Sequence, residues 1–219
     1  MPDRPAPALR ADARRNLEKL KAAAAEVFRE QGLNAPLEEV AQRAGVSIGT
    51  LYNRFGGRQE LIDAVVPELA GAKLGEAMRR AGAQPTPWSR FAVYIEEMCA
   101  LQAADTALND IIARSYQDAA ELTAICAESV VYGTRLLAEA QADGSLRPDL
   151  TADDVFVVFW LNSRLTRTTA ATAPDAWRRH IAFLLDGLRT PAATSLSAGP
   201  ETVTASLAAL LGGGPPRRR

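Results

Sequence analysis

Apolar side chains recur at three- and four-residue intervals along most of this chain, which is the spacing of helices that bury one face. Glycine, proline and short capping side chains separate these stretches, and no alternating pattern convincingly predicts a strand. The pattern therefore predicts an all-α protein. The expected helices are residues 12–31, 36–44, 47–55, 57–80, 87–103, 106–114, 118–143, 152–170 and 174–188.

The second and third of these helices are short and are separated by a tight turn. The second would bury one face, made of Leu37, Val40, Ala41 and Ala44. Gly45 can take the positive φ that ends such a helix, and Ser47 can cap the next one, with Leu51 and Phe55 facing inward. This is the layout of a helix-turn-helix, whose second helix enters the major groove of DNA.

The same segment resembles a known family. The matching positions are Ala41, Ala44-Gly45-Val46-Ser47, Gly49-Thr50-Leu51-Tyr52, Phe55, Arg58 and Leu61, which are similar in type and spacing to the signature of TetR-type transcriptional regulators. The resemblance implies a recognition helix at 47–54, with Tyr52 and Arg58 on the DNA backbone. It also implies a second helical domain that binds a small-molecule effector and forms a homodimer. The chain departs from the family pattern at Ile48, where a basic residue is frequent, and in the short loop before Pro36.

The residue types on the expected recognition helix suit DNA contact, because short or polar side chains let a helix approach the base edges. Gly49 would cost a helix about 1 kcal/mol relative to alanine, and close approach to DNA explains that cost. Asn53 can bond adenine, Tyr52 can donate to a phosphate, and Arg58 lies at a helix N-terminus that attracts anions. The candidate DNA-binding residues are Ser47, Ile48, Gly49, Thr50, Tyr52, Asn53 and Arg58.

The later helices carry large amphipathic side chains that are typical of a ligand pocket or of an ordinary core. Residue by residue, core packing is the better supported interpretation, and the resemblance implies a pocket without saying which side chains line it. The candidate pocket residues are Phe91, Tyr94, Met98, Tyr116, Tyr132, Trp160 and Arg164.

Two helical stretches near the C-terminus carry strongly apolar faces, one of them apolar on all sides at 155–161. In the resembled family the last two long helices pair with their symmetry mates in a four-helix bundle, which favours a two-fold dimer here. The residues expected at that interface are Phe156, Phe159, Trp177, Ile181, Leu184 and Leu185.

Composition bounds the remaining choices. The chain has 219 residues, a formal net charge of −1 and a single histidine, His180, on a polar stretch. Without a second candidate, no catalytic Ser/His/Asp or Cys/His set is plausible, and there is no phosphate loop. Cys99 and Cys126 lie in apolar stretches without metal-ligand spacing, so we expect free buried thiols, no metal and no cofactor. The missing catalytic set predicts that the protein is not an enzyme. No signal peptide or spanning segment is evident, which predicts a cytoplasmic protein that does not enter a membrane.

These inferences define four segments. Residues 1–11 are expected to be a disordered arm, 12–60 the helix-turn-helix domain, 61–190 the ligand-binding and dimerisation domain, and 191–219 a mostly flexible tail. The predicted function is a DNA-binding regulator, a repressor released by a small molecule, acting as a homodimer on a palindromic DNA operator. The alternative is a helical protein–protein interaction module.

Overall fold

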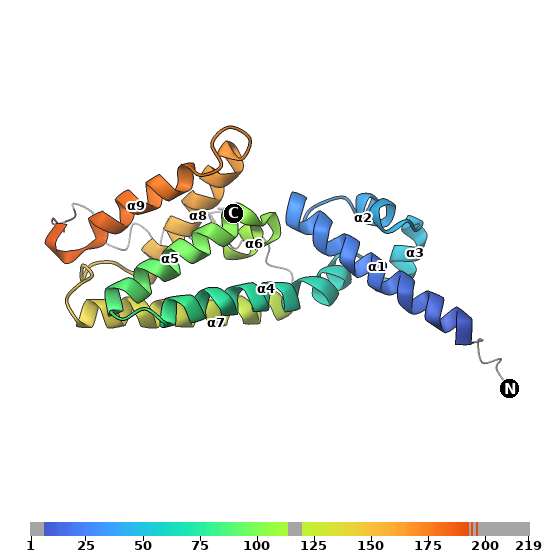
Figure 1. The fold of residues 1–219 in the computed structure, drawn as a ribbon, viewed down its shortest axis with the longest axis horizontal. Coiled ribbons are helices and arrows are strands. Elements are labelled where there is room, and N and C mark those ends of the chain that lie inside the picture. Colours follow the sequence, from blue (N-terminus) through green and yellow to red (C-terminus); the bar gives the residue numbers. More distant parts are fainter. Residues whose placement is uncertain (1–6, 114–119, 193, 195, 197–219) are drawn as a thin grey trace, which may run out of the picture.

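The computed structural model describes residues 7–113, 120–192, 194 and 196. Within these ranges the chain is almost entirely helical, which confirms the predicted all-α class (Figure 1). The helices are α1 (Pro7–Gln31), α2 (Leu37–Ala44), α3 (Ile48–Phe55), α4 (Arg58–Gly82), α5 (Pro87–Ala104), α6 (Thr106–Ile112), α7 (Ala120–Ala142), α8 (Ala152–Thr169) and α9 (Ala176–Leu188), followed by the short 3₁₀ turn η1 (Thr190–Ala192).

Both ends of the chain differ in part from the expected segments. Helix α1 begins at Pro7, so residues 7–11 are helical rather than part of the predicted arm. Residues 191 and 192 belong to η1. Residues 1–6, most of the predicted tail and Tyr116 lie outside the described residues.

The turn between α2 and α3 forms as the sequence predicts. Gly45 takes a φ of 70°, and the N–H of Val46 donates to the carbonyl of Ala41 at 3.0 Å. Ser47 then caps α3, because its side chain accepts a hydrogen bond from the N–H of Thr50 at 3.2 Å. The angle between the two helices is therefore set locally.

The core beneath this turn draws on more of the chain than the helix-turn-helix itself. Helices α1, α2, α3 and the first half of α4 contribute buried side chains, among them Phe28, Leu51 and Ile62. Helix α6 adds Ala107, Leu108 and Ile111 to the same cluster. This core therefore joins residues on both sides of the boundary that we expected near residue 60.

A second core lies among α4, α5, α7, α8 and α9. Helix α4 leaves the helix-turn-helix end and runs along this larger group, beside α5 and α7, while α8 and α9 lie across α5 from it (Figure 1). Thr86 and Thr151 start α5 and α8 with reciprocal caps to Ser89 and Asp154. Pro67 lies inside α4.

Cys99 is a free and fully buried thiol on α5, and burial raises its pKa far above the ordinary range of a cysteine. The side chain of Cys126 is not among those described. Over the part of the chain that the structure describes, no helix combines the length and the apolar character needed to cross a bilayer.

Candidate DNA-binding face and effector cavity

Helix α3 turns one side to the core and leaves the other open. Leu51 is fully buried, whereas Ser47, Gly49 and Asn53 are exposed. Tyr52 is 48% exposed, a large value for an aromatic side chain. The open face is thus the one that carries most of the predicted contact residues.

The other predicted residues of this helix are partly used by the fold. Ile48 is half-buried and packs against the helix-turn-helix core. Thr50 is also half-buried, and its hydroxyl lies 2.9 Å from that of Ser47 in a hydrogen bond. Ser47 and Thr50 therefore hold the start of the helix together, and Ile48 anchors it.

Nothing within the protein requires a glycine at position 49. A Cβ placed on it would meet only the Ser47 hydroxyl, at 3.9 Å, and its φ is not in the left-handed region. A glycine inside a helix costs about 1 kcal/mol relative to alanine. No contact that we observe offsets this cost. This is expected where the backbone must approach another molecule closely.

We therefore predict opposite effects of Gly49→Ala on stability and on DNA binding. The variant should gain up to about 1 kcal/mol of unfolding free energy. It should bind duplex DNA at least about fivefold more weakly, equivalent to about 1 kcal/mol, because the methyl group keeps the helix from the groove. Gly75→Ala is the matched control, since that helical glycine of α4 also faces open space. Chemical denaturation and a binding titration measure both quantities; unchanged affinity in Gly49→Ala would refute close approach at this position.

Arg58 has a different contact from the one we expected. Its Nη1 donates to the carbonyl of Leu33 at 2.9 Å and to that of Ala35 at 2.6 Å. These carbonyls belong to the loop before α2, whose N-cap residue, Pro36, offers no side-chain cap. Arg58 therefore secures the short α1–α2 loop, and its contact with a phosphate stays a prediction. Sequence reasoning missed this role because the partners are more than twenty residues away.

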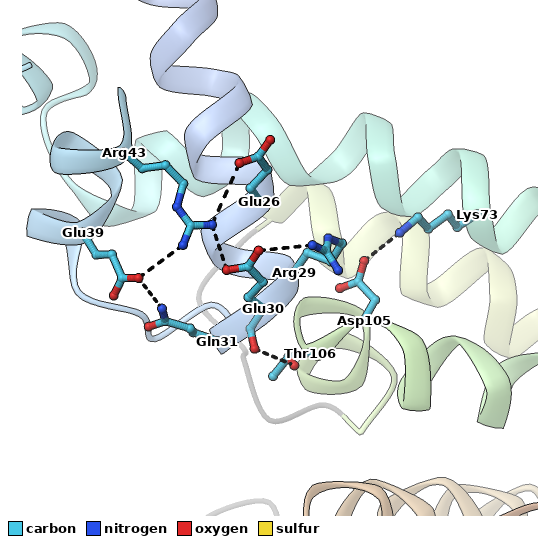
Figure 2. A network of polar contacts seen from close by, with 9 residues as sticks. All are labelled: Glu26, Arg29, Glu30, Gln31, Glu39, Arg43, Lys73, Asp105 and Thr106. Atoms are coloured by element: carbon cyan, nitrogen blue, oxygen red, sulfur yellow. Dashed lines mark hydrogen bonds and ion pairs between the residues drawn. The ribbon is translucent and has the colours of Figure 1, made fainter. Parts of the chain in front are cut away.

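Three arginines, Arg43, Arg54 and Arg58, lie on or beside this helix, but the positive surface that they form is smaller than their number suggests. Arg43 turns toward Glu26, Glu30 and Glu39, and its Nη1 lies 2.8 Å from a carboxylate oxygen of Glu30 (Figure 2). Arg54 is exposed and pairs with no acidic side chain of the described residues. Of the three arginines, Arg54 is thus the one that is exposed without an acidic partner among the described residues.

The second core contains a cavity of about 80 Å³. Its walls come from α4, α5, α6, α7 and α8, and they include Leu74, Tyr94, Met98, Ile111, Ile112, Ser129, Val130, Gly133, Thr134, Leu137, Ala152, Val155, Phe156 and Phe159. Among the described residues that line it, none has a charged side chain, and the polar side-chain groups are the hydroxyls of Tyr94, Ser129 and Thr134. Such a surface suits an uncharged, largely apolar molecule.

The predicted pocket residues divide into two groups. Tyr94 and Met98 line the cavity. Phe91 and Tyr132 do not line it: Phe91 is fully buried in the core, and Tyr132 donates its hydroxyl to the carbonyl of Met78.

Trp160 and Arg164 do not line the cavity either. They contact each other on α8, with the guanidinium carbon 5.4 Å from the ring centroid, and Arg164 is exposed. Of the predicted pocket residues that the structure describes, Tyr94 and Met98 thus line this cavity, and whether it binds the effector stays a prediction.

Tyr94 is fixed in the wall from two sides. Its hydroxyl donates to the carbonyl of Ser129 at 2.9 Å. Its ring lies so close to α7 that a Cβ on Gly133 would come within 2.6 Å of it. A glycine that no aromatic search would select therefore determines how this part of the cavity is shaped.

The residues expected at a dimer interface mostly belong to the interior of the single chain. Trp177, Ile181 and Leu185 are at most 5% exposed and pack in the second core. Phe159 is buried and Leu184 is half-buried, and Phe156 and Phe159 face the cavity instead. The stripe on α9 therefore covers its own domain, because a side chain already buried in one chain has little surface left for a partner.

The exposed apolar side chains on α8 and α9 are different ones. Leu161 is 45% exposed and Phe183 is 62% exposed. Helices α8 and α9 pack against each other, so these residues lie on neighbouring elements.

Across the described residues, no group of three or more His, Cys, Asp or Glu side chains could hold a metal ion.

Comparison with known proteins agrees with both halves of this arrangement. Residues 20–65 match bacterial regulatory proteins of the tetR family, and residues 86–190 match the C-terminal domain of SbtR-like transcriptional regulators. The HTH-type transcriptional repressor KstR2 of Mycolicibacterium smegmatis is 24% identical over 204 residues, covering 85% of this chain and 95% of that repressor.

Two solved structures show the same fold. FadR of Bacillus subtilis, in complex with stearoyl-CoA, aligns with a TM-score of 0.56 at 19% identity, over 77% of this chain and 97% of that one. The ketosteroid regulator KstR2 of Mycobacterium tuberculosis aligns with a TM-score of 0.55 at 21% identity, over 80% and 95% of the two chains. With both domains matched in chain order and the recognition helix open on its outer face, the chain belongs to the TetR family of bacterial transcriptional regulators.

Proposed function

We propose that this regulator is a homodimeric repressor that binds a palindromic DNA operator and is released by an uncharged, largely apolar effector. The observation that carries the DNA-binding part is the open face of α3, with Ser47, Gly49 and Asn53 exposed and Tyr52 half-exposed beside them. An asparagine on such a face can bond adenine through two atoms. Tyr52 and Arg54 are both exposed on this helix, and we propose that they contact phosphates beside the groove.

The proposed dimer uses the outer faces of α8 and α9. Leu161 and Phe183 are large apolar side chains that the single chain leaves exposed, and the Arg179 guanidinium stacks on the Phe183 ring with 4.7 Å between its carbon and the centroid. Two-fold pairing of these helices would bury both side chains in a four-helix bundle. It would also present two copies of α3 to successive major grooves.

The chemistry of the cavity supports the proposed effector class. Because no described lining residue is charged, an ion that enters the cavity would lose its hydration without compensation from these side chains. At about 80 Å³ the cavity is also smaller than the roughly 150 Å³ that admits benzene in other proteins. A ligand must therefore enlarge it. The FadR structure holds stearoyl-CoA, whose long apolar chain is the kind of group that we propose for this cavity.

Enlargement of the cavity is the proposed origin of release. Leu74 of α4 and Ile111 of α6 both line it, and both helices continue into the helix-turn-helix core. A ligand that separates the walls would move these helices and change the distance between the two recognition helices. A coupling of about 1–3 kcal/mol is enough for such regulation.

Selection from a library of random duplex DNA, at about 150 mM salt, tests this proposal. We expect enrichment of a palindrome whose half-sites are separated by about 10 base pairs or a multiple of that distance. The Asn53→Ala variant should lose preference at one base pair of each half-site, by about 1–3 kcal/mol. Equal affinity for selected and random DNA would instead favour a helical protein–protein interaction module. Addition of methyl stearate, an uncharged probe with a long apolar chain, to the selected complex then tests effector release; unchanged DNA binding would count against the proposed effector class.

A further inference from the structure

The backbone of Leu33, in the loop between α1 and α2, is hydrogen-bonded through both its N–H and its carbonyl. Its N–H donates to Oδ2 of Asp110 at 2.9 Å, and its carbonyl accepts from Arg58 at 2.9 Å. Asp110 lies on α6 and Arg58 begins α4. The loop that leads into the helix-turn-helix is therefore held by two different helices.

The second oxygen of Asp110 connects this loop to α8. Its Oδ1 accepts a hydrogen bond from Nη2 of Arg167 and forms an ion pair with it. The Asp110 side chain is only 8% exposed. A carboxylate so deeply buried requires charged or hydrogen-bonded partners, and its two partners here belong to different domains.

The loop sequence is adapted to this contact. Gly32 has a φ of 89°, and a Cβ on it would lie 2.5 Å from Oδ2 of Asp110. Only a glycine at this position therefore lets the carboxylate reach the next N–H. The side chain of Leu33 is fully buried, so it anchors this part of the loop in the core.

Helix α6 has further contacts near this junction. The Thr106 hydroxyl donates to the carbonyl of Glu30 at 3.2 Å, and Lys73 of α4 lies 2.7 Å from Asp105 (Figure 2). The residue after Asp110 is Ile111, which lines the cavity. Asp110 thus lies between the cavity, α8 and the loop that carries α2 and α3.

We propose that Asp110 is a positioning residue for operator recognition: paired with Arg167, it holds the α1–α2 loop and thereby fixes the orientation of the recognition helix relative to α8. This inference rests on the proposed function, since it assigns the route by which the second domain controls DNA binding. A fixed orientation favours binding, because less freedom is lost when two recognition helices dock together.

Arg167→Ala and Lys73→Ala make a matched pair for testing the proposal. Both remove a basic side chain that is about two-fifths exposed, 41% and 42%, and both leave an aspartate that is 8% or 9% exposed without its partner. Only Arg167 pairs with the carboxylate that holds Leu33. Both variants should fold, since neither truncates a buried apolar side chain.

Amide hydrogen exchange at Leu33 in the free protein measures the contact without DNA. We expect exchange about tenfold faster in Arg167→Ala than in the parent chain, and unchanged within about twofold in Lys73→Ala. Affinity for the selected operator should fall about five- to tenfold in Arg167→Ala alone. Combining Arg167→Ala with Asp110→Asn should add little to either change, because both act on one contact.

Equal exchange at Leu33 in the two alanine variants, or equal operator affinity, would overturn the proposal. If the parent chain selects no DNA sequence, the proposed function fails. The exchange rate at Leu33 still decides in that case whether Arg167 and Asp110 hold the loop.

Discussion

Phe183→Glu should give a folded monomer that binds the operator roughly 10²–10⁴-fold more weakly than the parent protein. Phe183 is 62% exposed on α9, so its replacement removes little from the interior of the single chain. In the proposed dimer, the substitution would bury a carboxylate in each protomer, which costs free energy even where Arg179 of the same helix can pair with it. Loss of the dimer would uncouple the two half-site contacts, since each recognition helix would then bind alone. Sedimentation equilibrium and a DNA titration measure the two effects.

Val131→Glu provides the control for this experiment. Val131 is 70% exposed on α7, outside the proposed interface. It should retain both the dimer and the operator affinity. A dimeric Phe183→Glu protein with full affinity would show that the interface lies on other elements. A monomer with full affinity would instead show that one recognition helix suffices for binding.

Leu108→Ala should lower the free energy of unfolding by about 2–5 kcal/mol, the usual range for truncating a buried leucine. Leu108 is 2% exposed on α6, yet it packs in the core of the helix-turn-helix. The loss should therefore appear in the DNA-binding helices, as faster amide exchange in α2 and α3. Chemical denaturation gives the total loss, and exchange measured residue by residue gives its location.

Leu136→Ala separates this effect from a general loss of stability. Leu136 is 1% exposed on α7 and belongs only to the second core. Its truncation should reduce stability by a similar amount while leaving exchange in α2 and α3 near the parent rates under conditions of local opening. Equal effects of both variants on α2 and α3 would mean that the two cores open as one unit.

The parts of this fold that could be predicted depend on short-range signals. The start of α3 at Ser47, of α5 after Thr86 and of α8 after Thr151 follows from capping side chains within three residues of the groups that they bond. The end of α2 follows from Gly45 for the same reason. The open face of α3 follows from the periodicity that buries Leu51.

The parts that could not be predicted depend on contacts between distant segments. An apolar stripe such as Trp177, Ile181 and Leu185 shows that one face of α9 is covered, but the covering surface could equally be the same chain or a second copy. The structure assigns the stripe to the same chain. Likewise, nothing near Arg58 indicates that its partners are the carbonyls of a loop that precedes it by more than twenty residues.

The cavity was difficult to predict for a related reason. Part of its wall comes from small residues, above all Gly133, whose role is to leave room for the Tyr94 ring. A search for large amphipathic side chains finds residues that fill space. It cannot find the positions where space is left.

Helix α6 follows α5 in the second part of the chain but contributes side chains to the helix-turn-helix core. This affects how chimeras of such regulators can be built. A chimera that joins residues 1–60 of this chain to the sensor domain of another regulator would leave Ala107, Leu108 and Ile111 behind. The helix-turn-helix core of the chimera would then pack against the α6 of the other regulator, with a gap or a clash where those three side chains belong. A working hybrid biosensor built from this protein should therefore transplant α6 together with the DNA-binding helices, even though α5 and most of α4 separate them in the sequence.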